Sequence, residues 1–234
     1  MDPHHTTVII GIGGLGAPCA MALAAAGVER LILVDPDTVS ISNLHRQPLF
    51  QEEDVGRRKV EVAAERLTRS APGLQVIGIP DWFNGQWDDR FADADAIVDG
   101  TDTVAAKFLV NDAAVRARIP LIHAGAIGWQ GQLLTVLPTH TACYRCVFEE
   151  APPPEDTPSC NEAGVLGPAV AFAGTLQAAE VLRVLHGKPP LYADSLLSFD
   201  LSTGRSRHVA VARRAGCHAC DAPNADVAGR SPHP

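Results

Sequence analysis

The sequence predicts a doubly wound α/β fold with a mostly parallel sheet, and three observations support this prediction. The chain opens with an apolar run, a glycine turn and a small-residue helix that lead to a second apolar run, which is typical of a βαβ unit. Apolar runs and helix-spaced segments then keep alternating, and such alternation builds a parallel sheet. Near the end, two strand-like runs flank a short polar turn, so we expect the last strands to be antiparallel.

The individual elements follow from the spacing of apolar residues. Strands are expected at 7–12, 30–34, 74–79, 96–98, 121–124, 196–200 and 207–211, and helices at 16–26, 57–70, 104–118 and 165–185. A polar loop is expected at 35–54, no element is assigned to 130–137, and the proline-rich APPPEDTP (151–158) predicts an extended crossing loop. We expect residues 1–220 to form one domain and residues 221–234, rich in Pro, Gly, Asn and Ala, to be a disordered tail.

Composition and charge exclude several classes of protein. A net charge of -8 with a pI near 5.5 repels phosphates, so nucleic acid is not an expected partner. A secretion signal requires Lys or Arg before its apolar run, and none precedes the first apolar run here. Polar residues and a proline interrupt the apolar stretch 165–185, which argues against a membrane span. Six cysteines without a secretion signal favour thiol or metal chemistry in a reducing compartment. We therefore expect a cytoplasmic protein.

A glycine loop after the first strand predicts a nucleotide site. Gly11, Gly13, Gly14 and Gly16 satisfy G-x-G-x-x-G between a strand and a helix, where bare backbone lets phosphates approach the helix N–H groups. Asp35 ends the second strand, where a carboxylate can accept hydrogen bonds from ribose hydroxyls. The same glycines also permit tight packing of strand on helix, and the motif alone does not distinguish NAD from ATP.

Two polar runs, SNLHRQ (42–47) and DVGRRK (54–59), place cations near the expected nucleotide. Hydride transfer has little need of them, whereas adenylation expels pyrophosphate, whose growing charge must be met by Arg, Lys and Mg²⁺. Arg46 and Lys59 are the candidates. Asp102 follows a later strand at the carboxyl edge of the sheet, where ligands of such sheets bind and where a carboxylate can hold Mg²⁺.

Two C-x-x-C pairs predict a metal site. Cys143, Cys146, Cys217 and Cys220 supply four thiols, which is the closed tetrahedral set of a structural zinc. The alternatives are chance pairs and a redox dithiol, which normally works as a single C-x-x-C at a helix start. Because some 70 residues separate the pairs, zinc would tie the C-terminal strands to the crossing loop.

The other two cysteines have different contexts. Cys19 stands among Ala and Met in the first helix, which predicts a small buried thiol. Cys160 stands between the proline-rich loop and the last helix, where a thiol is accessible and a helix N-terminus favours the thiolate. A chemical role and a bystander role both remain open for Cys160.

The motifs GIGGLG (11–16), DPDTVSISNLHRQ (35–47) and DVGRRK (54–59) resemble those of the ThiF/MoeB/HesA family, relatives of the eukaryotic ubiquitin-activating enzymes, and the resemblance runs from Val8 to Cys220. It implies a Rossmann-like adenylation domain. It also implies the following roles: Asp35 binds ribose, Asn43, Arg46, Gln47 and Lys59 line the ATP phosphates, Asp102 ligates Mg²⁺, and Cys160 matches a thiol proposed to capture the activated acyl group or to join sulfur transfer.

The resemblance further implies an activity. A homodimer of this family uses ATP to adenylate the C-terminal glycine carboxylate of a small ubiquitin-like or sulfur-carrier protein that ends in Gly-Gly. Sulfur transfer or thioester formation follows, and a sulfur donor is a further implied partner. The sequence departs from the family in two ways: Thr103 stands where many relatives have Asn, and only seven residues precede or enter the first strand, so no N-terminal arginine is expected to reach a partner's nucleotide. An NAD-dependent oxidoreductase and a non-catalytic adaptor with the same fold are the alternatives.

Overall fold

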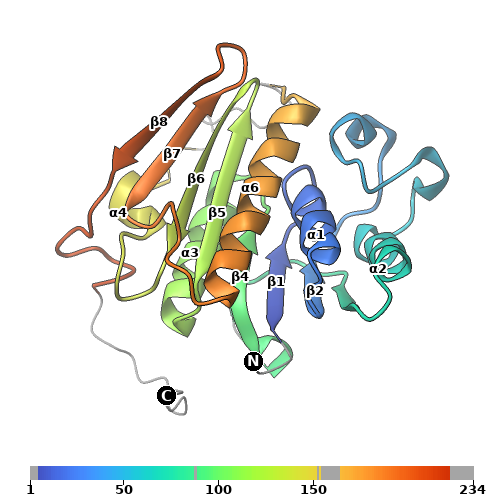
Figure 1. Ribbon diagram of the computed structural model, residues 1–234, viewed down its shortest axis with the longest axis horizontal. Helices are drawn as coiled ribbons and strands as arrows, with labels where there is room; N and C mark the ends of the chain where they lie inside the picture. The colour runs from blue at the N-terminus through green and yellow to red at the C-terminus, as the bar shows by residue number, and fades with distance from the viewer. Residues whose placement is uncertain (1–4, 87–88, 152, 154–163, 222–234) are drawn as a thin grey trace.

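The computed structural model describes residues 5–86, 89–151, 153 and 164–221. Within these residues one eight-stranded sheet runs through the molecule in the order β3-β2-β1-β4-β5-β6-β7-β8 (Figure 1). The first five strands in this order are parallel, and β6, β7 and β8 join them in antiparallel pairs. The predicted α/β fold with antiparallel C-terminal strands is therefore confirmed.

The strands are β1 (Thr6–Ile10), β2 (Arg30–Val34), β3 (Gln75–Ile79), β4 (Ala94–Asp99), β5 (Leu121–Ile127), β6 (Gln130–Val136), β7 (Ser195–Asp200) and β8 (Arg205–Ala210). The helices are α1 (Gly16–Ala25), α2 (Lys59–Ser70), α3 (Val104–Ala117), α4 (Tyr144–Phe148) and α6 (Gly167–Leu185), with 3-10 turns η1 (Ile41–Arg46), η2 (Glu52–Asp54) and η3 (Asp89–Phe91). Each expected element is present, with ends shifted by a few residues at most. The sequence analysis missed β6 and α4, and it described η1 and η2 only as a polar loop.

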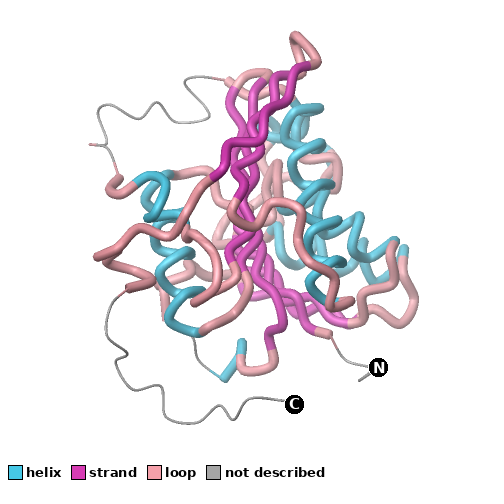
Figure 2. Tube along the Cα trace, turned by 60° about the vertical axis from the view of Figure 1, so that its left-hand side comes forward, coloured by secondary structure: helices cyan, strands magenta, loops and turns pink. Residues whose placement is uncertain are grey.

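The helices cover both faces of the sheet. Figure 2 shows the sheet nearly edge-on between two helical layers. One layer holds α1, α2 and α6, and the other holds α3 and α4. Residues of β1 alternate between the layers: Ile9 joins the core under α1, α2 and α6, whereas Val8 and Ile10 join the core under α3. Burial on both faces explains why the parallel strands are continuous apolar runs.

Helix α6 lies against α1 and against β4, β5 and β6. By length and composition it is the one helix among the described residues that could cross a membrane. Here one side of it is part of the core, and a Cβ on Gly174 would collide with the Leu15 carbonyl oxygen of the turn before α1. Its close packing on α1 accounts for the small and apolar residues along that side.

Two predictions about the fold lie outside the described residues. They concern most of the proline-rich crossing loop, at residues 152 and 154–158, and the tail that follows Asp221.

Candidate functional site

A cavity of about 560 Å³ opens at the carboxyl ends of the parallel strands. It lies where the strand order reverses between β1 and β4, which is the usual ligand position in open α/β sheets. The predicted site residues that line it are Gly11, Gly13, Gly14, Asp35, Asn43, Arg46, Gln47, Lys59 and Asp102. The fold thus brings segments far apart in the sequence to one place.

The glycine loop has a packing side and a cavity side. Gly11 has a positive φ of 88°, and a Cβ on it would come within 2.8 Å of the backbone of Gly100 at the end of β4. A Cβ on Gly16 would collide with the Gly11 carbonyl oxygen, and Gly16 does not line the cavity. Gly13 and Gly14 face the cavity. Packing therefore requires Gly11 and Gly16, while Gly13 and Gly14 leave the backbone open to a ligand.

Asp35 fixes the glycine loop by a hydrogen bond to its backbone. It is 5% exposed, and its Oδ2 accepts a hydrogen bond of 2.8 Å from the Ile12 N–H while its Oδ1 accepts one of 2.9 Å from the Asp37 N–H. Burial raises the pKa of this carboxyl, while Lys59 and the two N–H donors act in the opposite direction. Asp35 therefore fixes the loop and lines the cavity at the same time.

The turn η1 carries two of the predicted residues, Asn43 and Arg46, and a third, Gln47, directly follows it. Arg46 Nη2 donates to Asn43 Oδ1 at 2.8 Å, and Arg46 Nη1 donates to the Ser42 carbonyl oxygen at 3.2 Å. Gln47 is buried, its Oε1 has no hydrogen-bond partner among the described residues, and its Nε2 would be 3.4 Å from a Cβ on Gly13. Hydrogen bonds within η1 thus orient Arg46, and the Gln47 side chain lies against the glycine loop.

Lys59, the first residue of α2, is 3% exposed. Its Nζ donates to Asp37 Oδ2 at 2.7 Å and lies 4.0 Å from Asp35 Oδ1. The structure thus places the predicted lysine at the cavity and adds Asp37, a partner that the sequence analysis did not identify.

Strand β4 ends at Asp99, and the turn that follows it contains Gly100, Thr101 and Asp102. Asp102 is exposed toward the cavity, as a carboxylate that receives a cation should be. Asp99 is fully buried, and its Oδ1 accepts hydrogen bonds from the Thr101 N–H at 3.0 Å and from Thr101 Oγ1 at 2.6 Å. Asp99, which precedes this turn, therefore fixes it by two hydrogen bonds.

Lys107 and His123 surround the Asp99 carboxylate. Burial would raise the pKa of Asp99, but the Lys107 ammonium and the hydrogen bond from His123 hold that pKa well below its usual range. Lys107 Nζ also donates to the carbonyl oxygens of Thr101 at 2.8 Å and Ala124 at 2.7 Å. Lys107 is therefore committed to the backbone around the cavity rather than to a ligand inside it.

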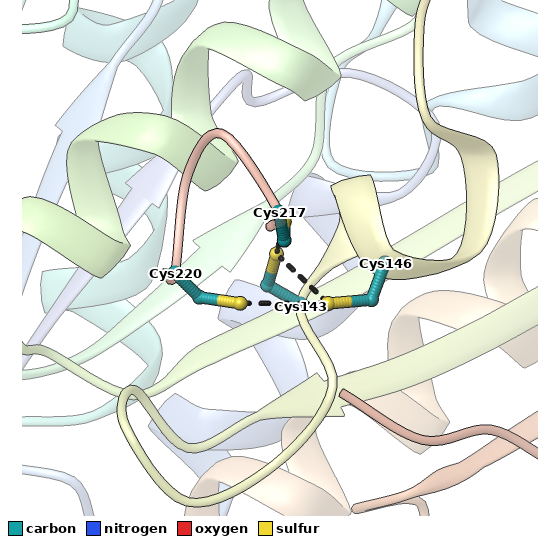
Figure 3. A group of neighbouring side chains, drawn as sticks. All are labelled: Cys143, Cys146, Cys217 and Cys220. Carbon is teal, nitrogen blue, oxygen red and sulfur yellow. Dashed lines mark hydrogen bonds between the residues drawn. The ribbon is translucent and has the colours of Figure 1, made fainter. Parts of the chain in front are cut away.

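The four cysteines of the C-x-x-C pairs gather at one point, although the pairs are 74 residues apart (Figure 3). Their sulfurs all lie within 4.8 Å of one another, and three of the separations are 3.8 Å (Cys143 to Cys146), 3.7 Å (Cys143 to Cys217) and 3.4 Å (Cys146 to Cys220). A tetrahedron with zinc–sulfur bonds of about 2.3 Å has sulfurs about 3.8 Å apart. The four thiols form no disulfide, and their spacing matches that of the ligands in a tetrathiolate metal site.

Of the other two cysteines, Cys19 and Cys160, the structure describes only Cys19. Cys19 is fully buried in α1, so the prediction of a small buried thiol is confirmed, and burial raises the pKa of this thiol. Cys160 lies outside the described residues, and its role stays a prediction.

The sequence analysis missed several residues that line the cavity. Trp82 and Phe83 follow β3 at the same sheet edge as Asp35, so the rule that places ligands at carboxyl ends of strands would have found them. The cavity also continues along β5, β6 and β7, where Gly125, Gln130, Gln132 and Ser198 line it. Tyr144 lines it too, and no sequence signal pointed there because it stands inside a cysteine pair.

Known proteins resemble this chain along most of its length. The chain is 42% identical to the sulfur carrier protein ThiS adenylyltransferase of Escherichia coli, over 94% of this chain and 87% of that protein. It is 39% identical to a sulfur carrier protein adenylyltransferase of Thermus thermophilus, over 92% and 82%. It is also 40% identical to the mouse adenylyltransferase and sulfurtransferase MOCS3, of which it spans only 45%.

Solved structures agree with this likeness. The crystal structure of E. coli MccB with ATP superposes with a TM-score of 0.78 at 26% identity, covering 93% of this chain and 67% of that one. The sequence also matches the ThiF family over residues 4–219. With the cavity at the topological switch point and the clustered cysteine pairs, this match shows that the chain belongs to the ThiF family.

Proposed function

We propose that the protein is an adenylyltransferase that uses ATP to activate the C-terminal glycine carboxylate of a small ubiquitin-like or sulfur-carrier protein. The observation that carries this proposal is the joint lining of one cavity by the open backbone of Gly13 and Gly14, the cations Arg46 and Lys59, and the carboxylate Asp102. Relatives of 39–42% identity are named as enzymes of this class.

The proposed reaction needs charge control at the phosphates. A carboxylate oxygen of the carrier protein attacks the α-phosphorus of ATP, the acyl–phosphate bond forms, and the bond between the α- and β-phosphates breaks to release pyrophosphate. Arg46 and Lys59 meet the negative charge that grows on the leaving group. Asp102 would hold Mg²⁺, which supplies further neutralisation of that charge, and Asp35 would bind the ribose.

The extension of the cavity along β5, β6 and β7 suits the tail of the carrier protein. Gly125 carries no side chain there, so its backbone is open to the cavity. Gln130, Gln132 and Ser198 can hydrogen-bond its backbone. A Gly-Gly end fits this passage.

Further parts of the proposal concern the metal and the partners. The four cysteines would hold a structural zinc, and free thiols arranged for a metal fit a reducing compartment such as the cytoplasm. We propose a homodimer and a sulfur donor as partners because the family resemblance implies both. Cys160 would act after adenylation, as the nucleophile that takes the acyl group from AMP.

The first test is ATP–pyrophosphate exchange with purified small proteins ending in Gly-Gly. Asp102→Asn should abolish exchange, and Cys160→Ala should retain it because the thiol acts later. Absence of exchange with every carrier, in a protein that binds Mg-ATP, would support the non-catalytic adaptor instead. Binding of NAD without protection by Mg-ATP in a thermal shift would support the oxidoreductase.

A further inference from the structure

Tyr144 connects the four-cysteine centre to the wall of the cavity. It directly follows Cys143 as the first residue of α4, and it is 4% exposed, yet it lines the cavity. The adenylation chemistry proposed above assigns no task to this ring. Its backbone stands between Cys143 and Cys146, and its side chain lines the cavity.

The tyrosine ring lies in an aromatic cluster. Its centroid is 4.2 Å from that of His123, 4.9 Å from that of Phe108 and 4.6 Å from that of Phe148. Phe108 meets it edge-on at 70°, whereas His123 is tilted by 47°. The nearest of the three rings is thus the imidazole of His123, which is completely buried.

His123 is held by one hydrogen bond and by packing. Its Nδ1 lies 2.6 Å from Asp99 Oδ2, and its Nε2 has no hydrogen-bond partner among the described residues. Burial lowers the pKa of His123, so the ring is neutral and donates its Nδ1 proton to Asp99. Nε2 therefore does not help to orient the ring, and the nearest aromatic contact of the ring is Tyr144, with 4.2 Å between the centroids.

Asp99 connects His123 to the turn that lines the cavity. Its other oxygen fixes Thr101 by two hydrogen bonds, and Asp102 follows Thr101 in the same turn. Tyr144, His123, Asp99 and the turn with Asp102 therefore form one continuous chain of contacts, with the cysteine centre at one end and the proposed Mg²⁺ ligand at the other.

A second connection prevents α4 from shifting. The Tyr144 N–H donates to Asn111 Oδ1 at 2.8 Å, and the Arg145 guanidinium forms two hydrogen bonds of 2.8 Å with Asp112. Both acceptors belong to α3, which also carries Lys107. A bidentate Arg–carboxylate pair fixes orientation as well as distance.

We propose that Tyr144 is a positioning residue for the nucleotide site: held between two cysteines of the metal centre, its ring orients His123 and thereby Asp99 and the turn that presents Asp102. The proposal rests on the proposed function for its consequence, which is tighter binding of Mg-ATP. Its structural content, the orientation of His123, can be measured without nucleotide.

The test compares three variants of the metal-loaded full chain. Tyr144→Leu removes the ring but keeps the backbone bond to Asn111, Tyr144→Phe keeps the ring, and Tyr192→Leu removes the other tyrosine of the chain, which packs on His208 at the far end of the sheet. Mg-ATP affinity is measured by calorimetry, and the Nδ1 proton of His123 is followed by proton NMR, assigned by its loss in His123→Asn. Metal content is measured for every variant.

We expect Tyr144→Leu to shift or broaden the His123 proton signal and to weaken Mg-ATP binding by about tenfold, with the metal retained. Tyr144→Phe and Tyr192→Leu should keep both properties within about twofold. An unchanged His123 signal in folded, metal-loaded Tyr144→Leu overturns the proposal, as does loss of the signal in Tyr144→Phe.

Two further outcomes are also decisive. If the wild-type protein binds no Mg-ATP, the proposed function fails, but the His123 signal still decides the role of Tyr144. If Tyr144→Leu does not fold, His123→Asn replaces it: an about tenfold loss of Mg-ATP affinity supports the chain of contacts, and wild-type affinity overturns it.

Discussion

Lys59 reaches the cavity already paired, because its Nζ lies 2.7 Å from Asp37 Oδ2. The ammonium is nearly buried, whereas the Asp37 side chain is 56% exposed. Such a pair holds the cation in place before a phosphate arrives, and a phosphate can approach from the open side. Lys59 is thus preorganised, which is what electrostatic catalysis requires.

Replacing this cation should weaken nucleotide binding specifically. We expect Lys59→Met to reduce Mg-ATP affinity by at least about tenfold, since a charged hydrogen bond is worth about 1.5–3 kcal/mol. The chain has three lysines, and Lys188, exposed after α6, gives the matched control Lys188→Met. Calorimetric titration with Mg-ATP measures both, and equal affinities in the two variants would contradict the assignment of Lys59.

The glycine loop predicts a difference in stability between two similar substitutions. Gly11 and Gly27 both have positive φ, of 88° and 84°. A Cβ on Gly11 would press on the Gly100 backbone, whereas a Cβ on Gly27 would meet nothing within 4 Å. Gly27→Ala should therefore cost only the strain of the left-handed conformation, about 1–2 kcal/mol, and Gly11→Ala should cost clearly more. Urea denaturation gives both free energies of unfolding, and similar values would refute the close approach.

His123 predicts that stability falls in mild acid. Burial lowers its pKa in the folded protein, so the unfolded chain binds the extra proton first and stability decreases as the pH drops below about 6.5. Asp99, Lys107 and Tyr144 face this ring, and Asp99 stays ionised throughout this range because its pKa is also lowered.

The slope is what the experiment measures. One group can contribute at most about 1.4 kcal/mol per pH unit. Free energies of unfolding between pH 7 and pH 5 should therefore depend less steeply on pH in His123→Asn than in the wild type, with the exposed His186→Asn as control for the loss of one histidine. Equal slopes in wild type and His123→Asn would be inconsistent with a neutral buried imidazole.

The cysteine centre predicts the effect of metal removal. A cross-link that closes 74 residues stabilises a folded chain by about 4 kcal/mol in the chain-entropy estimate, so chelation should lower the melting temperature by several degrees or more. Cys217→Ser should lose the metal, and Cys19→Ala should keep one metal per chain because Cys19 is buried in α1, away from the cluster. A reagent that modifies thiols releases the bound metal, and a metal indicator then measures the stoichiometry. A full metal content in Cys217→Ser would exclude the site.

Much of the fold was predictable because strand and helix patterns are local. The parallel strands are apolar runs bounded by turns, and β2 was predicted with its observed bounds, Arg30–Val34. By contrast, β6 has polar and small residues in its first half and mostly apolar ones in its second, without strict alternation, and it pairs with both β5 and β7. Local patterns do not contain that information.

The site was predictable where a motif carries its own spacing. The glycine loop, Asp35, Arg46, Lys59, Asp102 and the four cysteines of the two C-x-x-C pairs came from such motifs, and the structure gathers them in the cavity or in the cluster, except for Gly16, which does not line the cavity. Partners such as Asp37 for Lys59, and Lys107 and His123 for Asp99, could not be read from the sequence, because side-chain pairing depends on how β4, β5 and α3 meet.

The distance along the chain between the two cysteine pairs also sets an order of events during synthesis. Cys143 and Cys146 leave the ribosome early, but the second pair follows β8, so the tetrathiolate can be completed only after the last strand of the sheet has been made. Until then the first pair is an open dithiol that other metals or oxidants can reach. Binding of the proposed zinc would therefore follow synthesis of the last strand of the sheet.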